Sequence, residues 1–246
     1  MSPIVRNKII AIIPSRYQSS RLPGKPLIDL NGKTMIQRVY QQAKKCEYFE
    51  EVIIATDNDL IYNHASEYAT VMMTSAAHTN GTERCNEIIE KIGGNYDVIV
   101  NVQGDEPFVD PKALEQLCRA FEHPCEIATL YNLVENNSES HNSNTIKVVT
   151  DCNDNAMYFS RSTIPFLRNE GATNSIKKHI GVYGFSIPIF KKICTLPVVP
   201  IEYAESLEQL RWMYYGYKIK MIKTDYQSYG IDVPADIELL KKKGLI

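Results

Sequence analysis

A basic turn near the amino end is the first segment whose residue types suggest chemistry. Residues 14–26 read Pro-Ser-Arg-Tyr-Gln-Ser-Ser-Arg-Leu-Pro-Gly-Lys-Pro and directly follow the apolar run 9–13. The cations Arg16, Arg21 and Lys25 can pair with phosphate oxygens, and backbone amides of a small-residue turn can face the same oxygens. The turn contains neither G-x-x-x-x-G-K-[ST] nor G-x-G-x-x-G. We expect a triphosphate-binding loop, and the alternative is a solvated basic loop.

Two aspartates, Asp105 and Asp232, stand in short polar turns far apart in the sequence. Asp105 belongs to the run Gln-Gly-Asp-Glu-Pro, which follows the apolar stretch 98–102, and Asp232 belongs to Gly-Ile-Asp-Val-Pro. An acid at the carboxyl end of a strand faces the ligand crevice of an α/β sheet, and its oxygens suit Mg²⁺ bound to a triphosphate. Each aspartate could instead cap a turn or a helix. If the two turns meet, we expect the pair to hold Mg²⁺.

These motifs are set in an alternation of short β-branched runs and longer amphipathic stretches. Strands are expected at 9–13, 52–56, 71–74, 98–102 and 127–130. Helices are expected at 35–44, 59–68, 84–92 and 112–122. Parallel strands need crossover connections, so the alternation predicts an α/β fold with a mostly parallel central sheet and helices on both faces.

The second half of the sequence has a different rhythm. A polar stretch at 135–145 is expected to be an exposed loop. Strands are then expected at 146–150, 156–159 and 180–185, some of them antiparallel, and closing helices at 205–215 and 235–242. We interpret residues 1–246 as one domain, in which roughly 132–220 form a smaller β elaboration.

Composition and charge exclude several classes of function. A net charge of −2 gives no overall attraction to a polyanion, so neither a nucleic acid nor a membrane is an expected partner. The six cysteines show no C-x-x-C spacing and are expected to be reduced thiols. The first apolar run has five residues, too few for a signal peptide or a membrane span, and a cytoplasmic location is expected.

Taken together, the three motifs resemble those of the 3-deoxy-manno-octulosonate (Kdo) cytidylyltransferases, also called CMP-Kdo synthetases. Members of that family typically carry P-A-R-x-x-S-x-R-L-P-G-K-P, Q-G-D-E-P and G-x-D-x-P. The resemblance continues through the runs 55–57, 81–84, 147–149, 158–161, 164–165, 179–184 and 207–211, and so covers nearly the whole chain. It implies a Rossmann-like three-layer nucleotidyltransferase fold and a reaction in which CTP and Kdo give CMP-Kdo and pyrophosphate for lipopolysaccharide synthesis.

The resemblance also implies roles for individual residues and a homodimer. The nucleotide residues would be Pro14, Arg16, Arg21, Lys25, Thr74, His78, Gly81, Thr82, Arg84 and Asp105. The sugar-acid residues would be Gln103, Arg161, His179, Tyr183, Glu208 and Gln209. The catalytic group would be Arg16, Lys25, Asp105 and Asp232, with Mg²⁺ held by the two aspartates. Cationic Arg161 is a reasonable partner for the sugar carboxylate.

Some residues depart from the family pattern, and other interpretations stay open. Ser15 replaces the usual alanine, residues 74–78 lack the frequent arginine and aspartate, and Val233 and Ala235 replace the more usual threonine and glutamate. His179, Tyr183 and Glu208 could have purely structural roles. The acceptor could be another sugar acid, such as 8-amino-Kdo or a sialic acid, or a sugar phosphate, with CTP or UTP as donor. A nucleotide sensor without turnover is a further alternative, because a fold alone does not establish catalysis.

Overall fold

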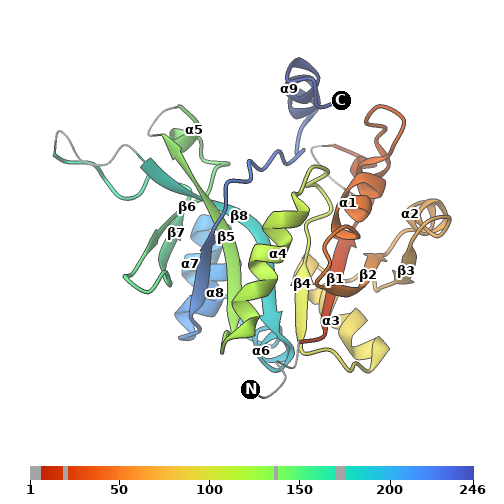
Figure 1. Ribbon diagram of the computed structural model, residues 1–246, viewed down its shortest axis with the longest axis horizontal. Coiled ribbons are helices and arrows are strands. Elements are labelled where there is room, and N and C mark those ends of the chain that lie inside the picture. Colours follow the sequence, from red (N-terminus) through yellow and green to blue (C-terminus); the bar gives the residue numbers. More distant parts are fainter. Residues whose placement is uncertain (1–6, 19–21, 136–137, 170–174) are drawn as a thin grey trace.

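The central feature of the fold is one mixed sheet (Figure 1). The computed structural model describes residues 7–18, 22–135, 138–169 and 175–246. Within them the strands along the sheet follow the order β3-β2-β1-β4-β8-β5-β9, and a β6-β7 pair joins the sheet through β8. The strands are β1 Ile9–Ser15, β2 Phe49–Thr56, β3 Thr70–Met73, β4 Val98–Asn101, β5 Ile127–Glu135, β6 Lys147–Thr150, β7 Ala156–Ser160, β8 Ser175–Ser186 and β9 Ile219–Lys223.

Helices cover both faces of this sheet. The helices are α1 Met35–Ala43, α2 Asp59–Ala65, α3 Gly81–Ile92, α4 Pro111–Arg119, α5 Ser138–His141, α6 Ile187–Ile193, α7 Pro200–Glu205, α8 Gln209–Tyr214 and α9 Pro234–Lys242, with 3₁₀ turns η1 Lys25–Leu27 and η2 Ala120–Glu122. Alternate residues of β1 pack into two different cores. One core contains residues of α1 and α4, and the other contains residues of α3, α6 and α8. The predicted three-layer α/β arrangement is therefore confirmed.

Strand direction decides where the site forms. β1 pairs in parallel with β2 and β4, and β2 pairs in parallel with β3. The register places Ser15 beside Thr56 and Ile12 beside Asn101, so these strands end close to one another. The basic turn after β1 and the polar turn after β4 therefore emerge at the same edge of the sheet.

An antiparallel strand lies in the middle of this sheet. β8 is antiparallel to both β4 and β5, and its Tyr183 lies opposite Asn101 at the end of β4. Going back along β8 from Tyr183 leads to His179, which lies opposite Tyr131. β8 therefore carries its side chains from the second half of the chain to the edge where the parallel strands end.

Side-chain caps explain where several helices begin. The Thr34 hydroxyl accepts a hydrogen bond from the Gln37 amide at the start of α1, and Asn80 Oδ1 accepts one from the Glu83 amide at 2.8 Å at the start of α3. These are the residue types that satisfy the unpaired amides of a first helical turn. The cap at Asn80 fixes the turn from which Gly81, Thr82 and Arg84 project.

The structure corrects parts of the expected second half. The single helix expected at 205–215 is wrong, because the chain forms α7 and α8, which are separated by residues 206–208, and Ser206 has a left-handed conformation (φ 50°). The expected loop at 135–145 contains the short helix α5, and β8 begins at Ser175, before the expected start. No described helix is both long enough and apolar enough to cross a membrane.

Candidate active site

Lys25 joins the two aspartates that the sequence singled out. Its Nζ donates a hydrogen bond to Asp105 Oδ2 at 2.7 Å and to Asp232 Oδ1 at 3.0 Å. Lys25 follows Gly24, whose φ of 67° suits glycine, and begins η1. Asp105 follows β4, and Asp232 lies in the segment that runs back from β9 toward α9 and the first half of the sheet (Figure 1). Three segments distant in sequence thus meet at one point.

Neither aspartate carboxylate caps the helix that follows it. Asp110 caps α4 by accepting a hydrogen bond from the Lys112 amide at 2.9 Å. At the start of α9, Asp236 Oδ2 accepts hydrogen bonds from the amides of Asp232 and Val233 at 2.7 and 2.9 Å. Because Asp110 and Asp236 supply the caps, Asp105 and Asp232 can present their carboxylates to Lys25.

Backbone contacts hold the turns together. The Ile231 amide donates a hydrogen bond to the Asp105 carbonyl at 3.0 Å. A Cβ on Gly104 would lie 2.7 Å from the Pro14 carbonyl oxygen, closer than side-chain carbons approach, so the turn after β4 can pack on the end of β1 only with glycine at this position. The glycine in the Gln-Gly-Asp run thus sets the spacing between the basic turn and Asp105.

A buried glutamate stands beside Asp105. Glu106 Oε2 accepts a hydrogen bond from Tyr226 Oη at 3.0 Å, and Oε1 accepts one from Ser228 Oγ. Burial, with the charge of Asp105, raises the pKa of Glu106 to about 7, and the two hydroxyl hydrogen bonds oppose that rise. Glu106 was not among the residues predicted from the sequence, although its place beside Asp105 was a signal that could have identified it.

The donor atoms at this point fit a magnesium ion. Asp105 and Asp232 offer carboxylate oxygens that converge on one cationic nitrogen, and Mg²⁺ in nucleotide sites is usually held by one or two carboxylates plus phosphate oxygens and waters. In the described part of the chain no group of three or more His, Cys, Asp and Glu side chains is arranged to hold a metal. The remaining ligands of a Mg²⁺ ion at this pair would therefore be phosphate oxygens and water.

A cavity of about 350 Å³ opens beside the basic turn. The predicted residues that line it are Pro14, Arg16, Lys25, His78, Gly81, Arg84, Gln103, Asp105 and Asp232. Two predicted nucleotide residues lie elsewhere: Thr74 is buried behind Arg84, and Thr82 lines a second cavity. Arg21 lies outside the described residues.

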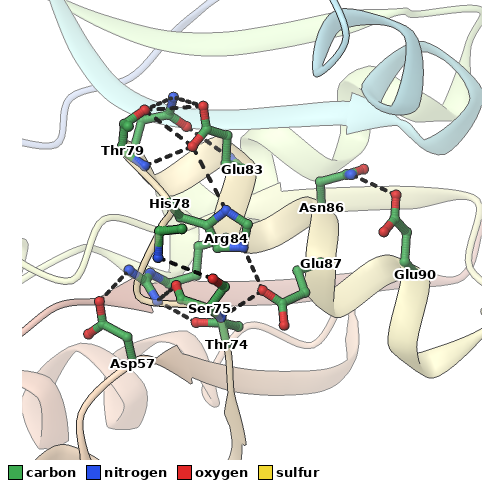
Figure 2. A network of polar contacts seen from close by, with 12 residues as sticks. Asp57, Thr74, Ser75, His78, Thr79, Glu83, Arg84, Asn86, Glu87 and Glu90 are labelled. Carbon is green, nitrogen blue, oxygen red and sulfur yellow. Dashed lines mark hydrogen bonds and ion pairs between the residues drawn. The ribbon is translucent and has the colours of Figure 1, made fainter.

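Figure 2 shows a polar network around Arg84, and the His78, Thr79 and Arg84 side chains of this network line the cavity. Arg84 Nη2 lies 2.8 Å from Asp57 Oδ2, and Nη1 donates to Thr74 Oγ1. The Arg84 side chain is only 3% exposed, so its charge is paired inside the wall. We infer that Arg84 mainly fixes the shape of the loop between β3 and α3.

His78 is held in the same network by Glu87. Burial would raise the pKa of Glu87, but hydrogen bonds from Lys91, the Ser75 amide and His78 outweigh it and lower the pKa to about 2. Glu87 is thus ionised at neutral pH and can only accept. Its Oε2 lies 2.5 Å from His78 Nε2, which must therefore carry a proton. The ring orientation of His78 is fixed as a result.

The second and larger cavity, of about 940 Å³, shares Gln103, Asp105 and Asp232 with the first. The predicted sugar residues that line it are Gln103, His179, Tyr183, Glu208 and Gln209. Lys178, Asn101 and Trp212 also line it, and the sequence analysis did not single them out. Their positions depend on strand register and on the packing of α8, which no short motif encodes.

Arg161 is bonded to the backbone near this cavity and lines neither of the two cavities. Its guanidinium donates to the carbonyl oxygens of Ser143, Glu205 and Ser206 at 3.0, 2.7 and 3.3 Å. Ser143 lies between Asn142 and Asn144, which both line the larger cavity. Arg161 therefore ties the loop before β6 to the end of α7.

His179 is neutral in the folded chain. Burial lowers its pKa to about 3. Its Nε2 lies 3.0 Å from Thr129 Oγ1, and that hydroxyl is itself placed to donate to the carbonyl of Ile180 or Val182. Because one hydroxyl carries one proton, Nε2 is the donor of the pair and Nδ1 is left as an acceptor. At neutral pH, His179 therefore offers hydrogen bonding without charge.

Glu208 connects the two cavities. Thr82 Oγ1, at the start of α3, donates a hydrogen bond to Glu208 Oε2 at 2.8 Å. Burial raises the pKa of Glu208, and the hydrogen bond from Thr82 opposes that rise. The contact joins the helix that begins beside the smaller cavity to the helical segment that lines the larger one.

Two adjoining cavities at the carboxyl ends of parallel strands, with paired aspartates between them, define an α/β nucleotide-binding protein with room for a second substrate. The family model described as cytidylyltransferase matches residues 10–220. The 3-deoxy-manno-octulosonate cytidylyltransferase of Parabacteroides distasonis is 46% identical over 242 residues, covering 94% of this chain and 96% of that protein. That of Bacteroides thetaiotaomicron is 45% identical over 241 residues, with coverage of 94% and 96%.

A solved structure agrees with these relatives. It is a CMP:2-keto-3-deoxy-manno-octonic acid synthetase complexed with CTP, with a TM-score of 0.90 and 36% identity, and the match covers 97% of this chain and 98% of that one. The chain belongs to the 3-deoxy-manno-octulosonate cytidylyltransferase family. A 4-diphosphocytidyl-2C-methyl-D-erythritol synthase of Anaerococcus prevotii, at 14% identity and a TM-score of 0.63, shares the fold.

Proposed function

We propose that this chain transfers CMP from CTP to the anomeric hydroxyl of Kdo, giving CMP-Kdo and pyrophosphate for lipopolysaccharide synthesis. The observation that carries the proposal is the contact of Lys25 with both Asp105 and Asp232 at the boundary of two cavities. One cavity is next to a basic turn and suits a nucleotide. The other is more than twice as large and is lined by amide, hydroxyl and carboxyl groups, which suit a polyhydroxylated acid.

CTP occupies the smaller cavity in this proposal. Arg16, Arg21 and Lys25 neutralise the triphosphate, and the loop that contains His78 and Gly81 lies along the cytidine. The network around Arg84 and Glu87 supports this assignment because it fixes the wall before the ligand arrives.

Asp105 and Asp232 hold Mg²⁺ at the boundary of the cavities. An ion held by these two carboxylates would supply positive charge to the α-phosphate of CTP and to the departing pyrophosphate. Lys25 can then contact phosphate oxygens, because its ammonium group lies at the same boundary as both carboxylates. The same three side chains thus order the reacting ends of both substrates.

Kdo occupies the larger cavity. Gln103, His179, Tyr183, Glu208 and Gln209 contact its hydroxyl groups, and the neutral ring of His179 supplies a hydrogen-bond acceptor. We assign its carboxylate to Lys178, a cation on the cavity wall, and we assign Arg161 to holding the 142–144 loop in place.

The reaction in this arrangement is a direct displacement. The anomeric oxygen of Kdo forms a bond to the α-phosphorus of CTP, while the bond from that phosphorus to the bridging oxygen of pyrophosphate breaks. The hydroxyl proton is lost to water. Positioning and charge neutralisation supply most of the acceleration, because no covalent enzyme intermediate is needed.

Pyrophosphate release across a panel of substrates tests this function. CTP with Kdo is expected to give a kcat/KM at least about tenfold above CTP with 8-amino-Kdo or a sialic acid, and above UTP with Kdo, because the cavity polar groups discriminate by unmatched hydrogen bonds. The panel also includes a sugar phosphate, which is a candidate acceptor that lacks a carboxylate. Nucleotide binding without any pyrophosphate release would instead indicate a sensor. A higher kcat/KM with a sialic acid than with Kdo would mean that the acceptor is a sialic acid.

We also propose that the enzyme is a homodimer in the cytoplasm. Met157 on β7, Phe166 in the loop before β8 and Tyr203 on α7 are large, exposed apolar side chains of the second half. Such exposed apolar groups favour burial against a second copy. The six free cysteines favour a reducing compartment. Light scattering that shows only monomer at micromolar concentration would contradict the dimer.

A further inference from the structure

Glu106 connects two segments that are far apart in sequence. Its carboxylate accepts hydrogen bonds from Tyr226 and Ser228, and the pair formed with Tyr226 spans 120 positions. Glu106 is 9% exposed and Tyr226 is 8% exposed, so the contact is shielded from water. Buried hydroxyl bonds to a carboxylate fix geometry more tightly than exposed ones do.

The segment that these bonds hold leads directly to Asp232. It leaves β9 attached to β5, because the Thr224 amide donates to the Tyr131 carbonyl at 2.9 Å and Asn132 Nδ2 donates to the Tyr226 carbonyl at 2.8 Å. Glu106 then holds it through Tyr226 and Ser228. The contact between the backbones of Ile231 and Asp105 follows, and Asp232 is the next residue.

Gly230 lets this segment pass close to the glutamate. A Cβ at position 230 would lie 3.3 Å from Glu106 Oε1, tighter than most such contacts. The turn that contains Asp105 and Glu106 therefore meets the 226–232 segment through side-chain hydrogen bonds, a close glycine and one backbone bond. The charge of Lys178 also acts on Glu106, but the direct contacts of the Glu106 carboxylate within the described residues are the hydrogen bonds from Tyr226 and Ser228.

We propose that Glu106 is a positioning residue that acts through Tyr226 and Ser228 to set the spacing of Asp105 and Asp232, and thereby the affinity for the divalent cation. This inference rests on the proposed metal-binding role of the two aspartates. The role of Glu106 differs from that of the two aspartates, because the Glu106 carboxylate accepts hydrogen bonds from the Tyr226 and Ser228 hydroxyls.

The test is Mn²⁺ binding to the CTP-bound enzyme, measured by electron paramagnetic resonance, together with the half-saturating Mg²⁺ concentration for pyrophosphate release. Glu106→Ala is expected to raise the Mn²⁺ Kd at least about tenfold, and Tyr226→Phe or Ser228→Ala about three- to fivefold, since each removes a hydrogen bond of about 1 kcal/mol. For Tyr226→Phe the KM for Kdo is expected to stay within about twofold, because Tyr226 lines neither cavity.

Glu106→Gln tests whether the hydrogen bonds of residue 106 or its negative charge affect Mn²⁺ binding. Its amide can accept from one hydroxyl and donate to the other, so the Mn²⁺ Kd is expected to stay within about threefold of the wild-type value. Adding Tyr226→Phe to Glu106→Ala is expected to weaken binding little further, because the shared bond is already lost. If Glu106→Ala does not fold, the two single hydroxyl variants carry the test.

Tyr96→Phe is a matched control. It removes a 2.8 Å hydroxyl bond to a carboxylate, Glu51, near the start of β4 and therefore at the opposite end of the strands from the site. It is expected to lower the melting temperature without changing the Mn²⁺ Kd. A comparable rise in Kd for Tyr96→Phe would mean that general destabilisation explains the effect, and would overturn the proposal.

Two further results would also overturn it. One is a Glu106→Ala variant whose Mn²⁺ Kd is within twofold of wild type, and the other is a Glu106→Gln variant as defective as Glu106→Ala, which would assign the effect to charge. Asp105→Ala separates this inference from the proposed function. If Asp105→Ala leaves Mn²⁺ binding intact, the proposed metal site is wrong. If Asp105→Ala weakens Mn²⁺ binding but the Glu106, Tyr226 and Ser228 variants do not, the metal site stands and only the positioning role of Glu106 is wrong.

Discussion

At the scale of single residues, the site places two like charges close together and pairs both of them with Lys25. Asp105 and Asp232 both lie within hydrogen-bonding distance of Lys25 Nζ, and the Lys25 side chain is only 12% exposed. A buried or half-buried cation shared by two acids limits their repulsion. The arrangement lets the chain fold with both carboxylates already facing one point.

The sequence motifs identified Lys25, Asp105 and Asp232, but not all of the other residues that line the larger cavity beside them. Lys25, Asp105 and Asp232 stood out because each lies in a short motif with a glycine and a charge. Lys178 and Asn101 lacked such a signal, since their positions on the larger cavity depend on the pairing of β4, β5 and β8. Arg161 was expected on the sugar carboxylate, and its three backbone hydrogen bonds became visible only once α7 and the 142–144 loop were placed.

His179 gives a prediction about stability and pH. Burial lowers the folded-state pKa to about 3 from a usual value of 6.5, so the unfolded chain binds the proton more readily. The stabilisation from neutral His179 is therefore complete above about pH 6.5 and is lost as the pH falls toward 3, by at most about 1.4 kcal/mol per pH unit. His179→Asn is expected to flatten the dependence of unfolding free energy on pH between 4.5 and 6.5.

Denaturant unfolding at several pH values checks this expectation. His123→Asn is the control for replacing a histidine with asparagine, because His123 is exposed in the loop before β5. An unchanged slope in His179→Asn would contradict the buried, neutral state of the ring.

At the scale of elements, the predicted alternation in the first half was confirmed because its helix and strand patterns are strong. Strands such as β1 are buried on both faces and therefore appear as continuous apolar runs. The second half was harder. β8 begins with Ser175, Ile176, Lys177 and Lys178, a mostly polar stretch that does not resemble a buried strand, and the periodicity at 205–215 gave no sign that the helix breaks at Ser206.

The break at Ser206 gives a prediction about stability. Ser206 has φ 50° and ψ 49°, a conformation that costs a residue with a side chain about 1 kcal/mol and costs glycine nothing. Ser206→Gly is expected to raise the unfolding free energy by up to about 1 kcal/mol, offset in part by the greater freedom of glycine in the unfolded chain. The Arg161 bond to the residue 206 carbonyl is kept in this variant, so the KM for Kdo should not change.

Ser66→Gly provides the comparison. Ser66 has a right-handed helical conformation (φ −63°) at the end of α2, where glycine is expected to destabilise by about 0.5–1 kcal/mol. Thermal unfolding of both variants would measure the difference. If Ser206→Gly lowers the melting temperature as much as Ser66→Gly does, the left-handed break between α7 and α8 is wrong.

At the scale of the whole molecule, two halves of the chain contribute to one reaction zone. The parallel strands β1 to β4 provide the nucleotide side, and β8, the 142–144 loop and α8 provide the larger cavity. The antiparallel β8 joins them, because it pairs with β4 and carries His179 and Tyr183 to the same edge. A sequence can indicate both halves separately, but only the sheet order shows that they meet.

In the proposed reaction, Asp105 and Asp232 act together at the boundary of the two cavities. The rate of CMP-Kdo formation at saturating CTP, Kdo and Mg²⁺ tests it most directly when Asp105→Ala and Asp232→Ala are compared with Asp110→Ala. The first two variants are expected to lose at least about a thousandfold in rate while keeping the wild-type circular dichroism spectrum, because the charge stabilisation of the α-phosphate is lost. Asp110→Ala removes only a helix cap, costing about 1 kcal/mol of stability, and should keep the rate within a few-fold. If the rate of Asp105→Ala is within about threefold of the rate of Asp110→Ala, the Asp105 carboxylate is not needed for the reaction. Removing a catalytic charge lowers the rate by far more than threefold.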